Sequence, residues 1–273
     1  MNMKERLKDE LEVNMAKVIA ICNHKGGVAK TATTASLGFG LARAGKKVLL
    51  VDSDHQGSLT ISLGWGLYEP LKITIKDKYM DVIEDRPLTK DGILTHEEGL
   101  DLLPSNLDFS SIAIPLINAY DRERVLKTYI DTLRDDYDYI LIDCKPDLDL
   151  IVVNALVAAD SVIIPVDATF LGACGMTQLF HTLAGIKKKL NRGLVFEGIL
   201  MTMVNKRTNI CKEMCEQVKE NWNDICPVFD VQIPRQTYAA EVAAMGISIY
   251  KYKPRSTVAK AYEKLTQEVL KHG

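Results

Sequence analysis

Six short apolar runs recur along the chain, separated by longer stretches in which charged and apolar residues mix. The runs occupy residues 17–22, 47–51, 100–103, 139–142, 160–166 and 196–204. Short runs that are mostly free of charge are typical of strands buried inside a sheet. The longer stretches predict helices, and strands that alternate with helices predict a parallel sheet with right-handed crossovers. We therefore predict a single α/β domain with a mostly parallel, twisted sheet and helices on both faces.

Helices are expected where apolar residues recur at helical spacing or where helix-forming residues accumulate. The expected helices cover residues 32–44, 105–118, 121–135, 149–159, 172–190 and 256–271. In the last of these, Val258, Ala261, Leu265 and Val269 share one side, which predicts a closing helix packed on the sheet. Residues 63–99 show little periodicity and are expected to hold one or two helices with loops.

The N-terminal residues differ from the rest of the chain. Residues 1–15 are charged and rich in helix formers, and they predict a separate extension that is compatible with a short amphipathic helix. The domain itself is expected to span residues 16–273. A length of 273 residues and a hydrophobic content of 47% suffice for one sizeable core.

Composition narrows the function classes. The formal net charge of −2 excludes a globally basic nucleic-acid coat, so DNA binding would have to come from local patches. No stretch approaches 18 uninterrupted apolar residues, and the charged N-terminus is unlike a signal peptide, so a cytoplasmic protein is expected. The six cysteines have no C-x-x-C spacing, and this argues against a disulfide framework or a zinc site.

The strongest candidate chemistry lies at residues 23–31, which read N-H-K-G-G-V-A-K-T. This stretch follows the first apolar run and precedes the first expected helix, which is the order that a phosphate-binding loop requires. Gly26 and Gly27 let the backbone approach an anion closely, while Lys30 and Thr31 offer an ammonium for phosphate and a hydroxyl for magnesium.

The loop departs from the usual G-x-x-x-x-G-K-[ST] pattern at two positions. His24 and Ala29 occupy the two glycine positions, and the stretch matches K-G-G-x-x-K-[ST] instead, with Lys25 as an additional lysine. The methyl group of Ala29 is expected to crowd a turn in which glycine normally lets the backbone close on the phosphates. The spelling therefore indicates a variant phosphate loop with two lysines.

Three acidic residues follow apolar runs. Asp52 and Asp54 end the second run, and Asp143 ends the fourth in the arrangement of a Walker B strand. The carboxyl ends of parallel strands meet at the edge of the sheet where open α/β folds bind ligands. We therefore expect these carboxylates beside the phosphate loop, where Asp143 would reach a magnesium ion through its water shell.

Together, these motifs resemble those of the ParA-type partition ATPases within the ParA/MinD group, and the resemblance extends over residues 17–271. It implies a P-loop NTPase with a deviant Walker A motif that uses ATP and Mg²⁺. The residues expected to hold the nucleotide are Lys25, Gly26, Gly27, Val28, Ala29, Lys30, Thr31, Ala32, Asn205 and Pro234. The residues implied for hydrolysis are Lys25, Lys30 and Asp54, with Asp54 orienting water, and those implied for magnesium are Thr31, Asp52 and Asp143.

The resemblance also implies macromolecular partners. Family members pair as ATP-dependent homodimers, bind double-stranded DNA nonspecifically, associate with the nucleoid and are stimulated by a ParB-type protein. Lys25 would reach the partner's phosphates. The residues expected to bind DNA are Lys206, Arg207, Lys251, Lys253 and Arg255. Tyr238 stands where a second DNA-binding arginine is common, and the run at 187–189 is either a solvated face or a further DNA contact.

Three alternatives remain open on the sequence. The first is a MinD-like ATPase that positions proteins on a membrane, although only two residues follow the last expected helix and no amphipathic tail is seen. The second is a redox or metal-carrier relative, for which Cys144 and Cys174 are the candidate ligands. The third is an adaptor that binds nucleotide poorly because of Ala29.

Overall fold

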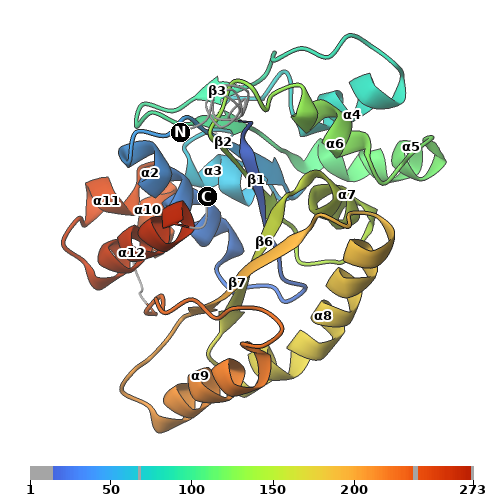
Figure 1. Cartoon of the computed structure of the whole chain (residues 1–273). Coiled ribbons are helices and arrows are strands. Elements are labelled where there is room, and N and C mark those ends of the chain that lie inside the picture. The colour runs from blue at the N-terminus through green and yellow to red at the C-terminus, as the bar shows by residue number, and fades with distance from the viewer. Residues whose placement is uncertain (1–14, 67–68, 236–238, 272–273) are drawn as a thin grey trace, which may run out of the picture.

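The computed structural model describes residues 15–66, 69–235 and 239–271, and its centre is one seven-stranded sheet (Figure 1). The strand order is β3-β4-β2-β5-β1-β6-β7. The strands are β1 (Lys17–Ile21), β2 (Val48–Ser53), β3 (Leu94–Thr95), β4 (Asp101–Leu103), β5 (Tyr139–Cys144), β6 (Ser161–Asp167) and β7 (Val195–Thr202). Every described pairing is parallel except that of β3 with β4. The predicted α/β fold with a mostly parallel sheet is confirmed.

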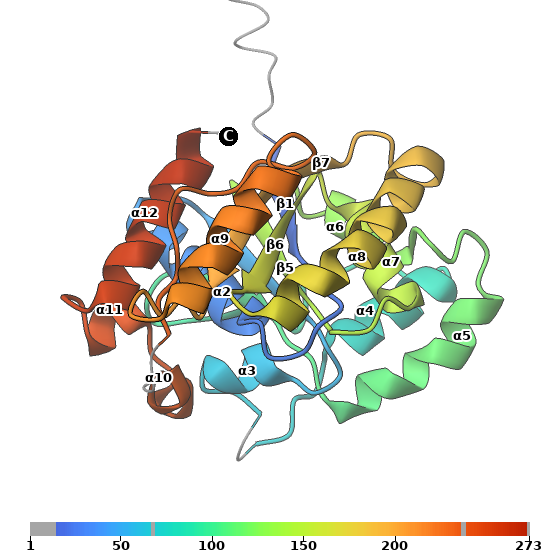
Figure 2. The same ribbon diagram turned by 90° about the horizontal axis from the view of Figure 1, so that it is seen from below.

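Helices cover both faces of this sheet. They are α2 (Lys30–Arg43), α3 (Ser58–Ser62), α4 (Ile75–Ile83), η1 (Leu107–Ile112), α5 (Ala113–Asn118), α6 (Val125–Asp131), α7 (Leu150–Ala158), α8 (Phe170–Lys189), α9 (Asn209–Trp222), α10 (Ala239–Met245), α11 (Ile249–Tyr252) and α12 (Thr257–Lys271). Figure 2 shows α12 on one side and α7 with α8 on the other, with the strands between them.

The continuous apolar runs have a direct explanation in this layering. In β1, Val18 and Ala20 pack in the core under α4 to α9, while Ile19 and Ile21 pack in the core under α2, α11 and α12. All four side chains are completely buried. Because successive strand residues point to opposite faces, a strand covered on both sides is apolar at every position.

The expected helices differ from the observed ones mainly in their extent. The segment expected at 121–135 is helical only in α6, and the segment at 105–118 divides into η1 and α5. The antiparallel strand β3 and the helices α10 and α11 were not expected. These elements have two, seven and four residues, which is too short for a periodic apolar pattern to appear.

Two expectations fall on parts of the chain that are not described. The N-terminal extension lies outside the described residues except for its last residue, Met15, and Tyr238 lies outside them as well. Within the described segments, no helix is both long enough and apolar enough to cross a membrane.

Candidate functional site

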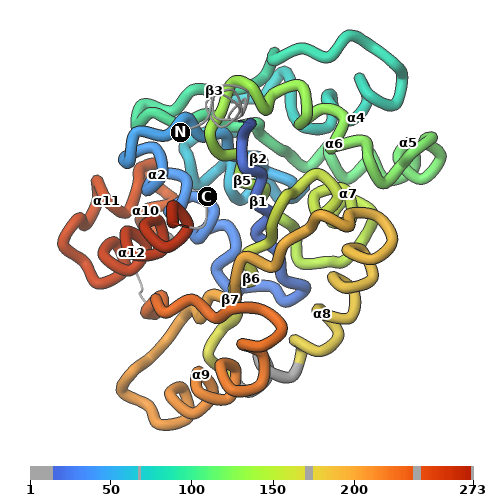
Figure 3. The backbone as a smooth tube through the Cα atoms, viewed as in Figure 1, coloured from blue at the N-terminus to red at the C-terminus, as the bar shows by residue number. Residues whose placement is uncertain are grey.

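The loop between β1 and α2 is fixed by the neighbouring strands (Figure 3). The side chain of Asn23 donates a hydrogen bond to the carbonyl of Pro165 in β6 at 2.7 Å and accepts one from the Lys25 N–H at 3.0 Å. The hydroxyl of Thr202, the last residue of β7, donates to the carbonyl of Val28 at 3.1 Å. These contacts attach the loop to β6 and β7.

Two residues of the loop have left-handed backbone conformations. Gly27 has a φ of 73°, and Ala29, which precedes the first residue of α2, has a φ of 67°. Glycine adopts this region freely, whereas a residue with a Cβ atom pays about 1 kcal/mol for it. The expected difficulty at Ala29 therefore has a backbone component, because its left-handed conformation favours glycine.

The space beside the two glycines is open. A Cβ atom added at Gly26 or Gly27 would have no described neighbour within 4 Å. The ammonium of Lys30 donates to the carbonyl of Lys25 at 2.9 Å, and Lys30 is only 7% exposed. The lysine is thus folded back across its own loop beside an open face of backbone, which fits an anionic group such as a phosphate.

Lys25 lies at the rim of the same loop and forms an ion pair within its own chain. Its ammonium lies 2.9 Å and 3.0 Å from the two carboxylate oxygens of Asp167, the last residue of β6. Asp167 was not identified from the sequence. Its signal was present, because Asp167 ends a buried apolar strand in the same way as Asp143 ends β5.

Asp52 and Asp143 face each other across neighbouring strands. They are register partners in the β2–β5 pair and are 0% and 1% exposed. Burial raises the pKa of Asp52 to about 6, although the side-chain and backbone hydrogen bonds from Thr60 oppose the shift. Burial, together with the charge of Asp52, raises the pKa of Asp143 to about 8. Burial thus makes the charged form of each carboxyl group less favourable than in water, and a nearby cation would offset this cost.

The two carboxylates differ in their hydrogen bonds. One oxygen of Asp52 accepts the N–H and the hydroxyl of Thr60 at 2.8 Å and 2.7 Å, and the other accepts the Asp54 N–H at 3.2 Å. Asp143 accepts only a long hydrogen bond from the Thr34 hydroxyl, at 3.3 Å, and a contact from Thr31. Asp143 therefore accepts fewer and longer hydrogen bonds than Asp52 and is the carboxylate more available to a ligand. Asp52, in contrast, holds the segment that carries Asp54.

The charge of this acidic pair fits a magnesium ion that keeps its own water and phosphate ligands. Thr31 and Asp143 would hold it, with Asp52 behind them. Among the described residues, no group of three or more His, Cys, Asp or Glu side chains could bind a metal by itself. A hard divalent ion with few protein ligands agrees with this, because Mg²⁺ seldom occupies an all-protein cage.

Asp54 begins the loop that leads to α3. Its carboxylate accepts the Gln56 N–H at 2.9 Å and lies 3.6 Å from Nδ1 of His55. The side chain is 15% exposed, so it is held at the edge of the site and still reaches solvent.

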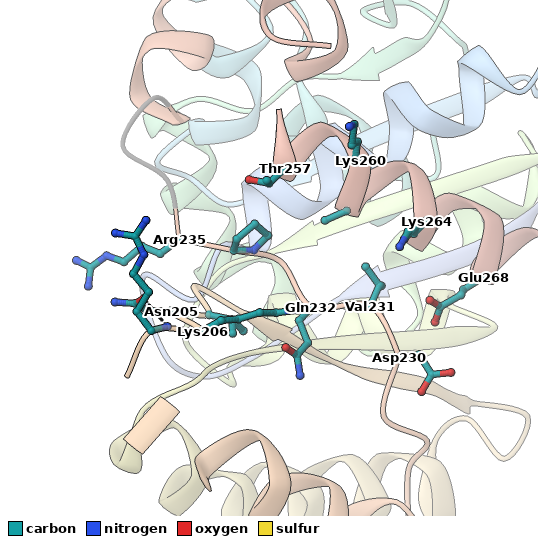
Figure 4. Close-up of a pocket in the computed structure, with 14 residues that line it drawn as sticks. Asn205, Lys206, Asp230, Val231, Gln232, Arg235, Thr257, Lys260, Lys264 and Glu268 are labelled. Carbon is teal, nitrogen blue, oxygen red and sulfur yellow. Dashed lines mark hydrogen bonds between the residues drawn. The ribbon is translucent and has the colours of Figure 1, made fainter. Parts of the chain in front are cut away.

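The residues expected around the base line two neighbouring cavities. One cavity, of about 520 Å³, adjoins the phosphate loop and is lined by Ala29, Thr31, Ala32 and Pro234 among others. The other, of about 970 Å³, contains Asn205 and also Pro234 (Figure 4). Pro234 therefore lines both cavities, whereas Asn205 is among the lining residues of the larger cavity alone.

The five cations expected to bind DNA do not form a single group. Lys206 and Arg207 are exposed in the turn between β7 and α9. Lys251 pairs with Glu97 at 2.5 Å, and Lys253 lies 5.2 Å from the centre of the Tyr252 ring. The fifth cation, Arg255, is exposed in the turn before α12.

The described cysteines lie in the core. Cys22 follows β1, and Cys144 ends the neighbouring strand β5. A contact with Cys22, together with burial, raises the pKa of Cys144 well above its usual range. Cys211 and Cys215 are also buried, as expected for small core residues on a helix. The side chain of Cys174 lies outside the described part. A buried Cys144 is unsuited to a ligand shared between two subunits.

Comparisons with known proteins agree with this geometry. A family profile described as an AAA domain matches residues 16–196. The sporulation initiation inhibitor protein Soj of Bacillus subtilis is 40% identical over 260 residues, which are 95% of this chain and 100% of Soj. The chromosome partitioning protein ParA of Caulobacter vibrioides is 34% identical over 262 residues, or 95% of this chain and 96% of ParA.

Solved structures share this fold, and one of the two compared below was solved with a bound ATP analog. A cobyrinic acid a,c-diamide synthase from Mycobacterium smegmatis, with bound ATP analog and magnesium, has a TM-score of 0.81 and 32% identity over 94% of this chain and 95% of that chain. The cell division ATPase MinD of Pyrococcus furiosus has a TM-score of 0.75 and 27% identity over 95% of this chain and 100% of MinD.

Proposed function

This chain belongs to the ParA/Soj family of partition ATPases, and we propose that it is an ATP-dependent switch for DNA segregation. In this proposal the ATP-bound chain forms a homodimer that binds double-stranded DNA without regard to sequence, and hydrolysis releases it. The observation that carries the proposal is the pair of lysines in one loop: Lys30 folded over the loop and Lys25 at its rim.

The loop side of the site would bind ATP and Mg²⁺. Lys30 and the backbone of Gly26 and Gly27 would contact the phosphates, while Thr31 and Asp143 would hold the metal. When bound, the metal supplies positive charge that offsets the charge of the phosphates during transfer to water. Ala32 and Pro234 would border the base, because both line the cavity that adjoins the loop.

Lys25 would make dimerisation depend on nucleotide. In the isolated chain its ammonium is neutralised by Asp167. The pair is partly exposed, so it contributes about 1 kcal/mol at most and can be exchanged. The phosphates of a partner subunit would attract Lys25 more strongly than one carboxylate does, and ATP brings one more phosphate than ADP.

Asp54 would orient water for a slow hydrolysis. Its carboxylate is held by the Gln56 N–H but remains at the solvent edge of the site. An incompletely fixed group is consistent with a low basal rate that a ParB-type partner increases by ordering the segment.

Exposed cations would bind DNA on the dimer. Lys206 and Arg207 supply charge at the β7–α9 turn, and Arg255 adds charge near the start of α12. Contacts with phosphates alone make binding independent of sequence and steeply dependent on salt. In the cell this would correspond to a cytoplasmic protein that associates with the nucleoid while it holds ATP.

Two observations each favour an alternative function. The likeness to MinD favours a positioning ATPase, for which co-sedimentation with liposomes in ATP is the test. The left-handed Ala29 favours an adaptor with weak nucleotide binding.

Sizing of the purified chain tests the proposal. The samples contain ADP, ATP, or ATP with a nonspecific duplex, each at two salt concentrations. We expect a monomer with ADP, a dimer with ATP, and a duplex complex that forms with ATP at low salt and weakens at high salt. The same size in all conditions would favour the adaptor and contradict the switch.

A further inference from the structure

The larger cavity is a groove that runs along α12 (Figure 4). One wall is the segment from Asp230 to Arg235, which follows α9. The opposite wall is α12, where Lys260, Lys264 and Glu268 line up across from that segment. The groove has a volume of about 970 Å³, compared with about 520 Å³ for the cavity beside the phosphate loop.

The charge of the groove is mainly positive. The five cations that line it are Lys206, Arg207, Arg235, Lys260 and Lys264. All five are exposed, and none has a carboxylate partner among the described residues, in contrast to the paired Lys251. The two acids that line the groove, Asp230 and Glu268, lie toward the end away from Arg235, and Asp230 is 3.5 Å from Lys219. Such a row of uncompensated cations attracts a polyanion.

Three of these cations were not expected to bind DNA from the sequence. Arg235 follows Pro234, while Lys260 and Lys264 are one helical turn apart on the exposed side of α12. Residues four apart on a helix are neighbours, so the two ammonium groups can contact adjacent positions of one ligand. They add to the positive charge that Lys206 and Arg207 bring to the groove.

The segment that forms the groove is also a wall of the nucleotide cavity. Pro234 and Arg235 line both cavities. The segment is bonded to the end of β7: the Val204 N–H donates to the carbonyl of Ile233 at 3.0 Å, and the Arg235 N–H donates to that of Val204 at 3.1 Å. A shift of this shared wall in the nucleotide cavity therefore changes the shape of the groove, and the reverse also holds.

We propose that the groove binds the phosphodiester backbone of DNA, with Lys260, Lys264 and Arg235 as contacts, and that the shared wall couples it to occupancy of the nucleotide cavity within one subunit. The inference rests on the proposed function, since it takes the base of ATP or ADP to lie against Pro234. Because both nucleotides have the same base, this coupling operates with ADP as well. The distinction between ATP and ADP comes from dimerisation.

Salt dependence tests the contacts. A fluorescent duplex is titrated with the full chain and ATP at several salt concentrations, for the wild type, for Lys260→Ala with Lys264→Ala, and for Lys72→Ala with Lys76→Ala. The last pair removes two cations at and just before the start of α4, and neither of them lines the groove. We expect the slope of log K against log salt to fall by about two for each subunit of the α12 variant and to stay unchanged for the α4 variant.

Affinity for ADP tests the coupling, because the proposed dimer does not form with ADP. At low salt, a saturating concentration of duplex should increase the affinity for a fluorescent ADP about fivefold in the wild type and less in the α12 variant. Conversely, ADP should increase the affinity of the chain for the duplex by the same factor. Circular dichroism and ATP affinity without duplex should match those of the wild type in both variants.

Three results would overturn the inference while leaving the proposed function intact. The first is an unchanged salt slope in the α12 variant, and the second is an ADP affinity that is the same with and without duplex. The third is that polyglutamate of equal charge binds as tightly as the duplex. Failure of the proposed function looks different, because the wild type itself would then bind the duplex no more tightly with ATP than with ADP.

Discussion

The phosphate-loop edge and the groove along α12 both gather charged residues, but in opposite ways. At the loop edge each cation is held by the chain itself, Lys30 by the carbonyl of Lys25 and Lys25 by Asp167. In the groove, five exposed cations come from three separate segments and have no carboxylate partner within the described residues. The first arrangement suits a small ligand that must be placed accurately, and the second suits a polymer that only needs charge.

The largest expected effect is a loss of ATP affinity on mutation of the phosphate-loop edge. Lys30→Ala removes the ammonium folded over the loop, and we expect ATP affinity to fall at least 100-fold, because a buried cation next to phosphates contributes several kcal/mol. Titration with a fluorescent ATP analogue measures this. Lys72→Ala, an exposed lysine away from both regions, is the control and should bind normally. A Lys30→Ala chain with unchanged affinity would show that the loop does not bind phosphate as proposed.

The next effect concerns pH. The folded pKa of Asp143, about 8, lies above its ordinary value near 4, so the folded chain binds this proton more tightly than the unfolded chain. The resulting stability is fully present below the ordinary pKa and is lost as pH rises through 8. Without nucleotide and magnesium, Asp143→Asn should therefore be more stable than the wild type at pH 9, on the order of a few kcal/mol, and nearly equal at pH 4.

Thermal unfolding at the two pH values measures this difference. The exposed Asp135→Asn serves as the control and should follow the wild type at both. In the presence of magnesium and ATP, Asp143→Asn should no longer hydrolyse ATP, because the variant lacks the carboxylate proposed to hold the metal. A destabilised Asp143→Asn at pH 9 would contradict the raised pKa of this buried carboxyl group.

A smaller effect is expected at Ala29. Ala29→Gly relieves about 1 kcal/mol of left-handed backbone strain in the loop, and we expect ATP affinity to rise about fivefold. Calorimetric titration with ATP and magnesium is the measurement. Gly185→Ala, at a position in α8 with open space and no left-handed φ, is the control for a glycine–alanine exchange outside the loop and should bind ATP as the wild type does. Equal or weaker binding by Ala29→Gly would mean that the loop has already accommodated the alanine.

The smallest expected effect is at Asp167. Asp167→Asn removes the carboxylate that holds Lys25 within its own chain, and we expect ATP-dependent dimers to form up to about fivefold more tightly, since the pair is partly exposed. Analytical ultracentrifugation in ATP gives the dissociation constant. Glu197→Gln breaks the pair with Lys17, which lies at the opposite end of β1 from the loop, and should have no such effect. Weaker dimers in Asp167→Asn would assign Asp167 to the interface itself.

The same comparison explains what the sequence could and could not predict. The strands and the loop edge follow from contiguous patterns: an apolar run that ends in Asp52 or Asp143, and a glycine turn before a helix. The positions of Lys30 and Thr31 were therefore predictable. The pairing of Lys25 with Asp167 was not, because the two residues are 142 positions apart and meet only where β1 and β6 are neighbours.

The groove escapes prediction for the same reason. Lys260 and Lys264 look like the solvated face of an ordinary amphipathic helix, and only the fold brings them opposite Arg235. Conversely, Lys251 was expected to bind DNA because of its charge, yet its partner Glu97 lies in the turn between β3 and β4, which the sequence pattern did not reveal.

Lys25 provides the most direct test of the central claim, that ATP makes this chain dimerise through a lysine of its phosphate loop. Sedimentation velocity compares the wild type and Lys25→Ala in ATP with magnesium, with ATP binding measured on the same samples. The account predicts that the wild type dimerises and that Lys25→Ala, while still holding ATP through Lys30, remains monomeric and hydrolyses ATP poorly. Dimerisation and hydrolysis by Lys25→Ala at wild-type levels would contradict it.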